Sequence, residues 1–188
     1  MNILERAIIY ATNAHESLKR KNSTLPYIVH LMEAMVIAST ITQDMEVLAA
    51  VALHDTVEDA GVKLGDIEKE FGHYVAELVA SETEDKMEYE TEEATWIFRK
   101  HEAVDQLRIT EDRNVRIIWL SDKLSNIRAI RRDYDRLGES IWNTFHMKDP
   151  REQAWYYRTI AELLEKDLGE TDAWKEYDGL VKEVFKSV

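Results

Sequence analysis

Residues that break helices are scarce along this chain. It contains two prolines and six glycines in 188 residues, and apolar residues recur at helical spacing nearly throughout. No internal repeat is visible, and no linker is long enough to divide the chain into separate domains. The pattern therefore predicts an all-α, single-domain helical bundle that ends in a C-terminal helical extension.

Caps and breakers set the expected helix limits. Pro26 suits the first turn of a helix, where its missing N–H costs nothing. Gly61 and Gly72 are expected to stop helices, and Asp149 followed by Pro150 is the clearest helix start. The expected helices cover residues 2–19, 26–40, 42 or 44 to 60, 64–71, 73–82, 92–108 (capped by Thr91), 111–133 (capped by Thr110), 150–167 and 172–186.

Composition excludes several classes of protein. With 45% hydrophobic and 32% charged residues, the chain is typical of a soluble globular protein. The longest apolar run, Val47 to Leu53, is too short to cross a membrane, and the first residues lack the features of a signal peptide. There is no cysteine, and the net charge is −13. We therefore expect a cytoplasmic protein without thiol chemistry that does not bind nucleic acid.

Three basic clusters stand out against this acidic background. Taken one at a time, each is most simply a solvated helix face, but together they offer local sites for a small phosphate. They comprise Lys19, Arg20 and Lys21; Arg99 and Lys100; and Lys123 with Arg128, Arg131 and Arg132.

The stretch "LAAVALHDTVEDA", residues 48–60, starts as a core helix and ends on polar residues. In one helix, His54 would stack on Glu58 and Asp55 on Asp59. Anions are disfavoured at a helix C-terminus, and imidazole with carboxylates suits Mn²⁺, Fe²⁺, Ni²⁺ or Zn²⁺. A divalent metal would explain the cluster. A helix end that reaches solvent would explain it equally well.

A second carboxylate lies inside an apolar helix. In "NVRIIWLSDKLSNIRAI", Asp122 interrupts a core stripe of Ile117, Leu120, Leu124 and Ile127, and Asn126 follows one turn later on the same face. A buried acid needs a partner. Lys123 is expected on another face, which leaves a metal or a distant arginine. His30, one turn into the helix after "LPY", is by itself more typical of a core or boundary residue.

The set His30, His54–Asp55 and Asp122 resembles the HD superfamily of metal-dependent phosphohydrolases. The segments "LPYIVH", "ALHDTVEDAGV", "FGHYVAELVASETEDK" and "LSDKLSNIRAI" are similar, in order and approximate spacing, to motifs of the (p)ppGpp hydrolase domain of Rel/Spo proteins and of stand-alone small alarmone hydrolases. The resemblance covers about residues 5 to 135. It implies an HD hydrolase core over residues 1–135, with residues 136–188 forming helices that pack on the same domain.

The resemblance also implies roles for individual residues. One divalent metal, Mn²⁺ first, would be bound by His30, His54, Asp55 and Asp122. Glu58 and Asp59 match the acidic pair that positions or deprotonates the attacking water. The implied reaction releases the 3′-pyrophosphate of (p)ppGpp, leaving GDP or GTP. The implied substrate contacts are Arg20, Lys21, Tyr27, Lys123, Asn126, Arg99 and Lys100.

Other functions stay open at this point. The same chemistry could act on another nucleotide, such as pppApp, NADPH or a deoxynucleoside monophosphate. A non-catalytic alarmone-binding module is a further alternative, although it would not need Glu58 and Asp59. A helical protein-interaction module is the last alternative function. The aromatic C-terminal helices would suit it, and they would equally complete the core or a homodimer interface.

Overall fold

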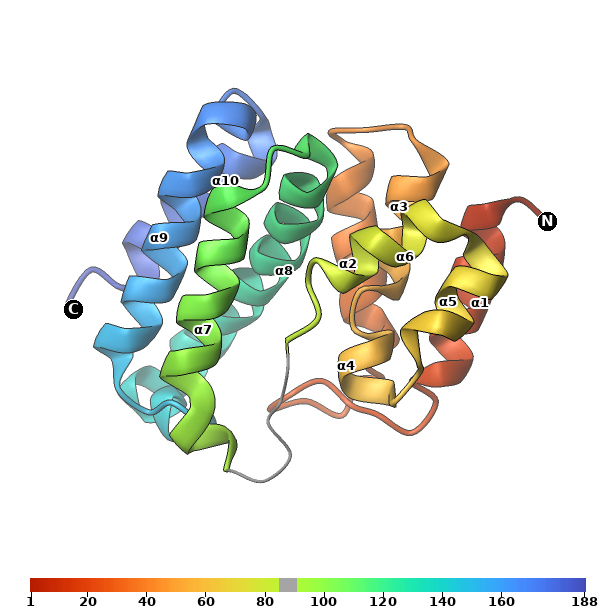
Figure 1. Ribbon diagram of the computed structural model, residues 1–188. Helices are drawn as coiled ribbons and strands as arrows, with labels where there is room; N and C mark the ends of the chain where they lie inside the picture. Colours follow the sequence, from red (N-terminus) through yellow and green to blue (C-terminus); the bar gives the residue numbers. More distant parts are fainter. Residues whose placement is uncertain (85–90) are drawn as a thin grey trace.

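The computed structural model describes residues 1–84 and 91–188, and within these ranges it is built of helices without a β-strand (Figure 1). This confirms the all-α prediction. The helices are α1 (Ile3–Ala14), α2 (Ile28–Ser39), α3 (Met45–Leu53), α4 (Thr56–Ala60), α5 (Leu64–Phe71), α6 (His73–Ala80), α7 (Glu92–Ile109), α8 (Arg113–Leu137), the 3₁₀ helix η1 (Gly138–Thr144), α9 (Pro150–Leu168) and α10 (Asp172–Val184).

Most helix starts follow the capping rules. Thr91 accepts a hydrogen bond from Ala94 N at the start of α7, and Asp149 accepts one from Arg151 N ahead of Pro150. The start predicted at Thr110 is wrong by two residues, because the Asp112 carboxylate caps α8 instead. Asp85 and Lys86, at the end of the "SETEDK" motif, lie outside the described residues.

The first predicted helix is too long. α1 ends at Ala14, because the buried His15 ring places Nδ1 2.8 Å from the Ala11 carbonyl oxygen and satisfies that helix end. The chain then turns, and Lys19 pairs with Pro26 in an isolated β-bridge. This turn carries the first basic cluster away from α1 and toward the start of α2.

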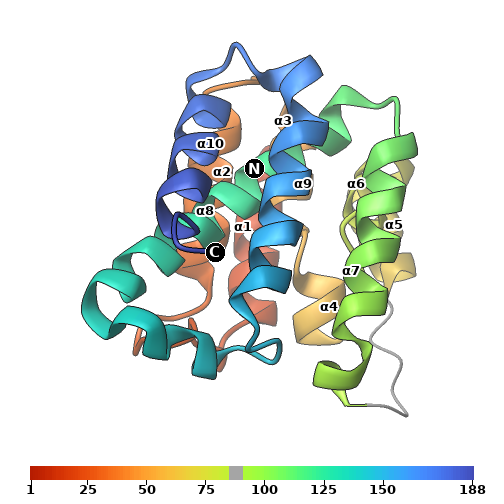
Figure 2. The ribbon, with the colours of Figure 1, turned by 90° about the vertical axis from the view of Figure 1, so that its left-hand side faces the viewer.

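α8 is the central helix of the bundle. It packs against α2 and α3 on one side and against α9 and α10 on the other. Figure 1 shows the helices of the first half of the chain on the other side of α8 from α9 and α10, and Figure 2 looks onto the side formed by α7, α9 and α10. The predicted stripe of Ile117, Leu120, Leu124 and Ile127 is fully buried. Asp122 therefore lies in the middle of the protein, between the two halves of the bundle.

The aromatic C-terminal helices complete the core. Tyr157, Tyr177 and Phe185 are buried, and the Tyr177 hydroxyl donates to the Tyr157 carbonyl oxygen at 3.0 Å. Burying these rings removes a large apolar area from water. These aromatic side chains are thus used within one chain, and a homodimer stays a prediction. No helix in the described part of the chain is both long and apolar enough to cross a bilayer.

The single helix expected up to residue 60 is wrong, because the chain breaks between α3 and α4. The Thr56 hydroxyl donates to the Leu53 carbonyl oxygen at 2.6 Å, and His54 Nδ1 lies 2.7 Å from the Val51 carbonyl oxygen. In a continuous helix these carbonyl oxygens would accept backbone N–H groups of the next turn, but here they accept hydrogen bonds from side chains instead. Glu58 and Asp59 consequently lie in the first turn of α4, where a helix dipole favours anions.

Candidate functional site

Two histidines face each other where α2 meets the end of α3. His30 lies in α2 and His54 caps α3, both are buried, and their ring centroids are 5.3 Å apart. His54 Nδ1 donates to the Val51 carbonyl oxygen. His30 Nδ1 lies 2.8 Å from Ser125 Oγ, whose proton goes to Glu33 at 2.8 Å. These bonds assign the proton of each neutral imidazole to Nδ1 and leave both Nε2 lone pairs toward a common point.

The carboxylates of Asp55 and Asp122 lie at the point that the two Nε2 atoms face. His30 Nε2 lies 3.0 Å from Asp122 Oδ1 and 3.4 Å from Asp55 Oδ2. His54 Nε2 lies 3.1 Å from Asp55 Oδ2 and 3.5 Å from Asp122 Oδ1. The donor atoms of His30, His54 and Asp122 are all within 4.8 Å of one another. The structure thus brings together all four predicted ligands, which come from α2, the α3–α4 junction and α8.

This arrangement fits a divalent metal. Two ligands about 2.1 Å from one ion lie about 3.0 Å apart at a right angle and about 3.4 Å apart at a tetrahedral angle, close to the four separations found here. His54 Nε2 is buried and makes no hydrogen bond in the described part of the chain, although carboxylate oxygens are near. The nitrogen is therefore placed as a metal ligand would be. Oxygen and imidazole donors suit Mn²⁺, Fe²⁺ and Zn²⁺.

The charges of the four groups stabilise one another. Burial opposes ionisation, but Asp55 and Asp122 raise the pKa of His54 well above its ordinary value. Burial likewise opposes the charged form of Asp122, yet Lys123 and the two imidazoles hold the pKa of that carboxyl well below its usual range. Without a metal, the site therefore attracts a proton at neutral pH. Metal binding must displace such a proton, so metal affinity falls as the pH falls.

Lys123 does pair with Asp122, contrary to the prediction from helix faces. Its ammonium donates to Asp122 Oδ2, while Asn126 Nδ2 donates to Asp122 Oδ1 at 2.6 Å. The lysine stem is long enough to curl back along α8, so the position of its Cα does not decide which side its charge occupies. The pairing of Asp122 with Asn126 one turn later follows the predicted spacing.

The predicted acidic pair lies beside the metal ligands. The Tyr27 hydroxyl bridges Asp55 Oδ2 at 2.8 Å and Asp59 Oδ2 at 3.0 Å, which ties one carboxylate of the pair to a predicted ligand. Burial raises the pKa of Glu58 to about 7, with repulsion from Glu84, Asp55 and Asp59 adding to the effect. A carboxyl group with this pKa can take or give a proton near neutral pH.

A cavity of about 530 Å³, here called the basic cavity, opens next to these residues. Five basic side chains line it against two acidic ones, in a protein of net charge −13. An anion would be attracted there by the local field. The predicted contacts on its wall are Arg20, Lys21, Tyr27, Lys100, Lys123 and Asn126; other lining residues include Lys19, Trp96, Asp133, Phe145, Gln153, Tyr156 and Tyr157.

Arg99 is placed differently from the other predicted contacts. Its side chain is buried and donates to Glu84 Oε2 at 2.9 Å and to Thr95 Oγ1 at 3.2 Å. It borders a smaller cavity that also includes Glu58 and Lys100, so it reaches the edge of the site with its guanidinium already paired. Lys100 Nζ contacts the same Glu84 at 2.5 Å.

Sequence reasoning missed several residues around the site. Glu33 and Ser125 orient His30, and neither carries a motif of its own. Tyr156 and Gln153 reach the basic cavity from α9, a part of the chain outside the motifs. Ser125 had one detectable signal, because it lies three residues after Asp122 and so shares a helix face with it.

Comparisons with known proteins agree with this geometry. A family model described as "HD domain" matches residues 7–150. A protein of Aquifex aeolicus named guanosine-3′,5′-bis(diphosphate) 3′-pyrophosphohydrolase is 34% identical over 128 residues, and the match covers 68% of this chain and 18% of the relative. A "GTP pyrophosphokinase rsh" of Brucella melitensis is 30% identical over 193 residues, covering 89% of this chain and 25% of the relative. The chain therefore spans a quarter or less of these relatives.

Two solved structures share the fold along nearly the whole chain. The structure of lmo0812 from Listeria monocytogenes EGD-e has a TM-score of 0.74 and 31% identity, and covers 90% of this chain and 100% of its own. A metazoan ortholog of SpoT that hydrolyzes ppGpp has a TM-score of 0.77 and 24% identity, and covers 97% of this chain and 96% of its own. Because the match to the metazoan structure covers 97% of this chain, it includes most of α9 and α10.

Proposed function

The chain belongs to the HD domain family, and we propose that it is a metal-dependent phosphohydrolase that removes the 3′-pyrophosphate of (p)ppGpp. The convergence of two histidines and two aspartates on one point, beside a basic cavity, is the single observation that carries this proposal. The name of the Aquifex relative and the ppGpp hydrolysis by the metazoan SpoT ortholog support the choice of (p)ppGpp. A cytoplasmic location is part of the proposal.

His30, His54, Asp55 and Asp122 would hold the metal, and Mn²⁺, which the resemblance to the alarmone hydrolases implies, is our first choice among the ions that nitrogen and oxygen donors suit. When bound, the ion would lower the pKa of water and neutralise charge on the phosphates. Ser125 and Val51 fix the two imidazoles in the tautomer that leaves Nε2 unprotonated. The chain's own contribution to the metal is thus a set of ligands oriented before it binds.

We assign proton transfer to Glu58, with Asp59 as its positioning partner. The water oxygen attacks the phosphorus attached to the ribose 3′ oxygen, and Glu58 takes the water proton. The bond from that phosphorus to the 3′ oxygen breaks, the 3′ oxygen gains a proton, and pyrophosphate leaves. Asp59 is held by the Tyr27 hydroxyl at 3.0 Å, whereas burial gives Glu58 the pKa of about 7 that a base requires.

The basic cavity would bind the nucleotide. Arg20 donates to Asn126 Oδ1 at 2.9 Å and its guanidinium lies 5.8 Å from the Tyr27 ring centroid, which forms a wall for a flat base. Lys21, Lys100 and Lys123 line the same cavity, and we propose that they contact the phosphates. Arg99 must leave Glu84 to reach a phosphate, so we propose it as a phosphate contact only in the substrate-bound state.

The test is a product assay with Mn²⁺ and ppGpp, run beside an EDTA control and the Asp122→Asn variant. We expect GDP and pyrophosphate in equal amounts from the native chain, and neither product from the two controls. No turnover by a chain that binds Mn²⁺ would refute the substrate, and pppApp, NADPH and deoxynucleoside monophosphates would be assayed next. Turnover that persists in EDTA and in Asp122→Asn would refute the metal-dependent mechanism.

A further inference from the structure

α2 carries apolar side chains on the side that faces solvent. They are Leu25 (52% exposed), Val29 (42%), Met32 (41%) and Val36 (60%), here called the α2 row. At about 100° per residue, the three members within the helix fall within about 60° of one another. Leu25 precedes the helix and lines one cavity together with Val29. The four side chains therefore form a continuous exposed row.

The α2 row carries no charge. In Ile28–Ser39 the only ionisable side chains are His30, which is buried, and Glu33. Glu33 is turned toward α8, where it accepts from Ser125 Oγ at 2.8 Å and pairs with Arg128 at 3.3 Å. Covering the row removes no charged group from water, which would be costly. The row is therefore suited to contact with another protein surface.

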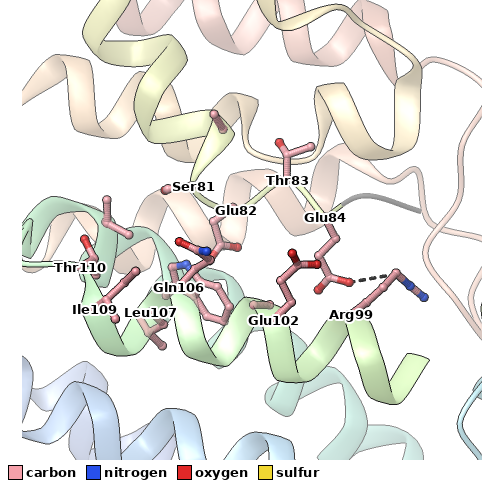
Figure 3. Close-up of a pocket in the computed structure, with 14 residues that line it drawn as sticks. Ser81, Glu82, Thr83, Glu84, Arg99, Glu102, Gln106, Leu107, Ile109 and Thr110 are labelled. Atoms are coloured by element: carbon pink, nitrogen blue, oxygen red, sulfur yellow. Dashed lines mark hydrogen bonds and ion pairs between the residues drawn. The ribbon is translucent and has the colours of Figure 1, made fainter. Parts of the chain in front are cut away.

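Other exposed apolar side chains stand among polar groups. Ile109 is 70% exposed, and Figure 3 shows it at the border of a cavity whose lining also includes Glu102. Ile9 on α1 is 47% exposed and lies one turn from Glu5 and from Asn13, both exposed. Single apolar residues of this kind are normal on a protein surface and indicate no partner. A row of four differs from them.

The two ends of the α2 row differ in charge. Beside its start, Leu25 and Val29 line a cavity of about 290 Å³ that four basic side chains border against two acidic ones. The basic side chains are Arg20, Lys21, Arg132 and Arg136. Beside its end lies the C-terminus of α2, which carries partial negative charge, and Asp44 and the exposed Glu46 follow at the start of α3. The row thus runs from a basic end to an acidic end.

A second copy of the chain matches these features. If two copies pair α2 against α2 in antiparallel orientation, Leu25 faces Val36 of the second copy, and Val29 faces Met32. Spacings of four and three residues let such side chains interlock. The basic end of each row then lies at the acidic end of the other, whereas a parallel pair would place like charges together. Elsewhere on the surface, two chains of net charge −13 repel each other.

We propose that the α2 row is a self-association surface, on which a second copy of this chain packs with its α2 antiparallel. Four side chains that are about half exposed supply less than the about 800 Å² per partner of a standard interface. We therefore expect a weak dimer, with a dissociation constant on the order of 10–100 μM. The pairing does not depend on the proposed hydrolysis.

The first test is sedimentation equilibrium of the full chain, without nucleotide, from about 5 to about 500 μM. We expect the mean mass to rise from that of one chain toward that of two. Met32→Asp should stay monomeric over this range, because it puts a charge into the covered row. Ile9→Asp is the matched control, since it adds the same charge at a similarly exposed apolar position, and it should dimerise like the native chain. Circular dichroism checks that both variants fold.

Cross-linking tests the orientation. The chain contains no cysteine, so Leu25→Cys and Val36→Cys each introduce a single thiol. In the antiparallel pair, the two copies of position 36 lie about 16 Å apart along the helix axis, beyond the about 7 Å between Cα atoms that a disulfide spans. A mixture of the two variants should therefore form a disulfide-linked dimer about tenfold faster than either variant alone.

Three results would overturn the proposal. The native chain could stay monomeric up to about 500 μM, which would leave the row without a second copy. Met32→Asp could dimerise like the native chain, which would place the contact on another surface. Either cysteine variant alone could cross-link as fast as the mixture, which would exclude the antiparallel pair.

Discussion

The hydrogen-bond relay behind His30 provides the sharpest test of the metal site. Ser125 Oγ accepts from His30 Nδ1 and donates to Glu33, so it fixes the tautomer that leaves Nε2 free. In Ser125→Ala the metal-free ring can adopt the other tautomer, with Nε2–H donating to Asp122 Oδ1 at 3.0 Å. A metal would have to break this new bond and leave Nδ1–H unpaired in a buried site.

The expected loss follows from that unpaired group. A buried donor without a partner costs about 1–3 kcal/mol, which corresponds to about 5- to 150-fold in a binding constant. Outer-shell partners of metal-binding histidines typically contribute about 10- to 100-fold. We therefore expect Ser125→Ala to bind Mn²⁺ about 10- to 100-fold more weakly, with the fold retained.

Ser121→Ala is the matched control. Ser121 is equally buried on α8, but its hydroxyl donates to the Ile117 carbonyl oxygen at 2.7 Å. Both variants lose one buried hydroxyl, and only one of them touches the relay. Mn²⁺ affinity would be measured by calorimetry and by the EPR signal of free Mn²⁺. If Ser125→Ala binds Mn²⁺ within threefold of Ser121→Ala, the assigned role of the relay is incorrect.

Two further predictions concern the surroundings of the candidate metal site. The pKa of Glu58 is raised from 4.5 to about 7 in the metal-free protein, so the folded state loses stability as the pH rises between these values, and the loss is complete above about pH 7. Glu58→Gln should then increase the free energy of unfolding in EDTA by up to about 3 kcal/mol at about pH 8 and not at about pH 4; urea titrations giving equal gains at both would contradict this. Arg20→Ala should raise KM for ppGpp about tenfold without changing Mn²⁺ affinity, whereas Arg113→Ala, at the exposed start of α8, should change neither.

Local rules predicted the parts of the fold that depend on neighbouring residues. Asp149 and Pro150 lie side by side in the sequence and start α9 as expected, and the stripe on α8 needed only the helical period. The break after α3 was not predictable in this way. It depends on His54 and Thr56 bonding to carbonyl groups of the preceding turn, where helix formation and side-chain bonding compete closely.

In the candidate site, too, some features could be predicted from the sequence and others could not. The four candidate ligands were found because their spacing resembles a known family, and the structure brings them together. The Ser125 relay joins residues 92 and 95 positions apart, and no local pattern reports such a contact. The partner of Asp122 was misjudged for a related reason, since helix geometry fixes the Lys123 Cα and leaves four side-chain bonds free to rotate.

Lys123 connects the four candidate metal ligands with the basic cavity. Its ammonium donates to Asp122, lies 3.7 Å from Glu82 Oε2 and lies 4.9 Å from the Trp119 ring centroid, and its side chain also lines the basic cavity. Positive charge added at Asp122 weakens the hold of that carboxylate on Lys123, so the ammonium becomes available to Glu82 or to a substrate phosphate.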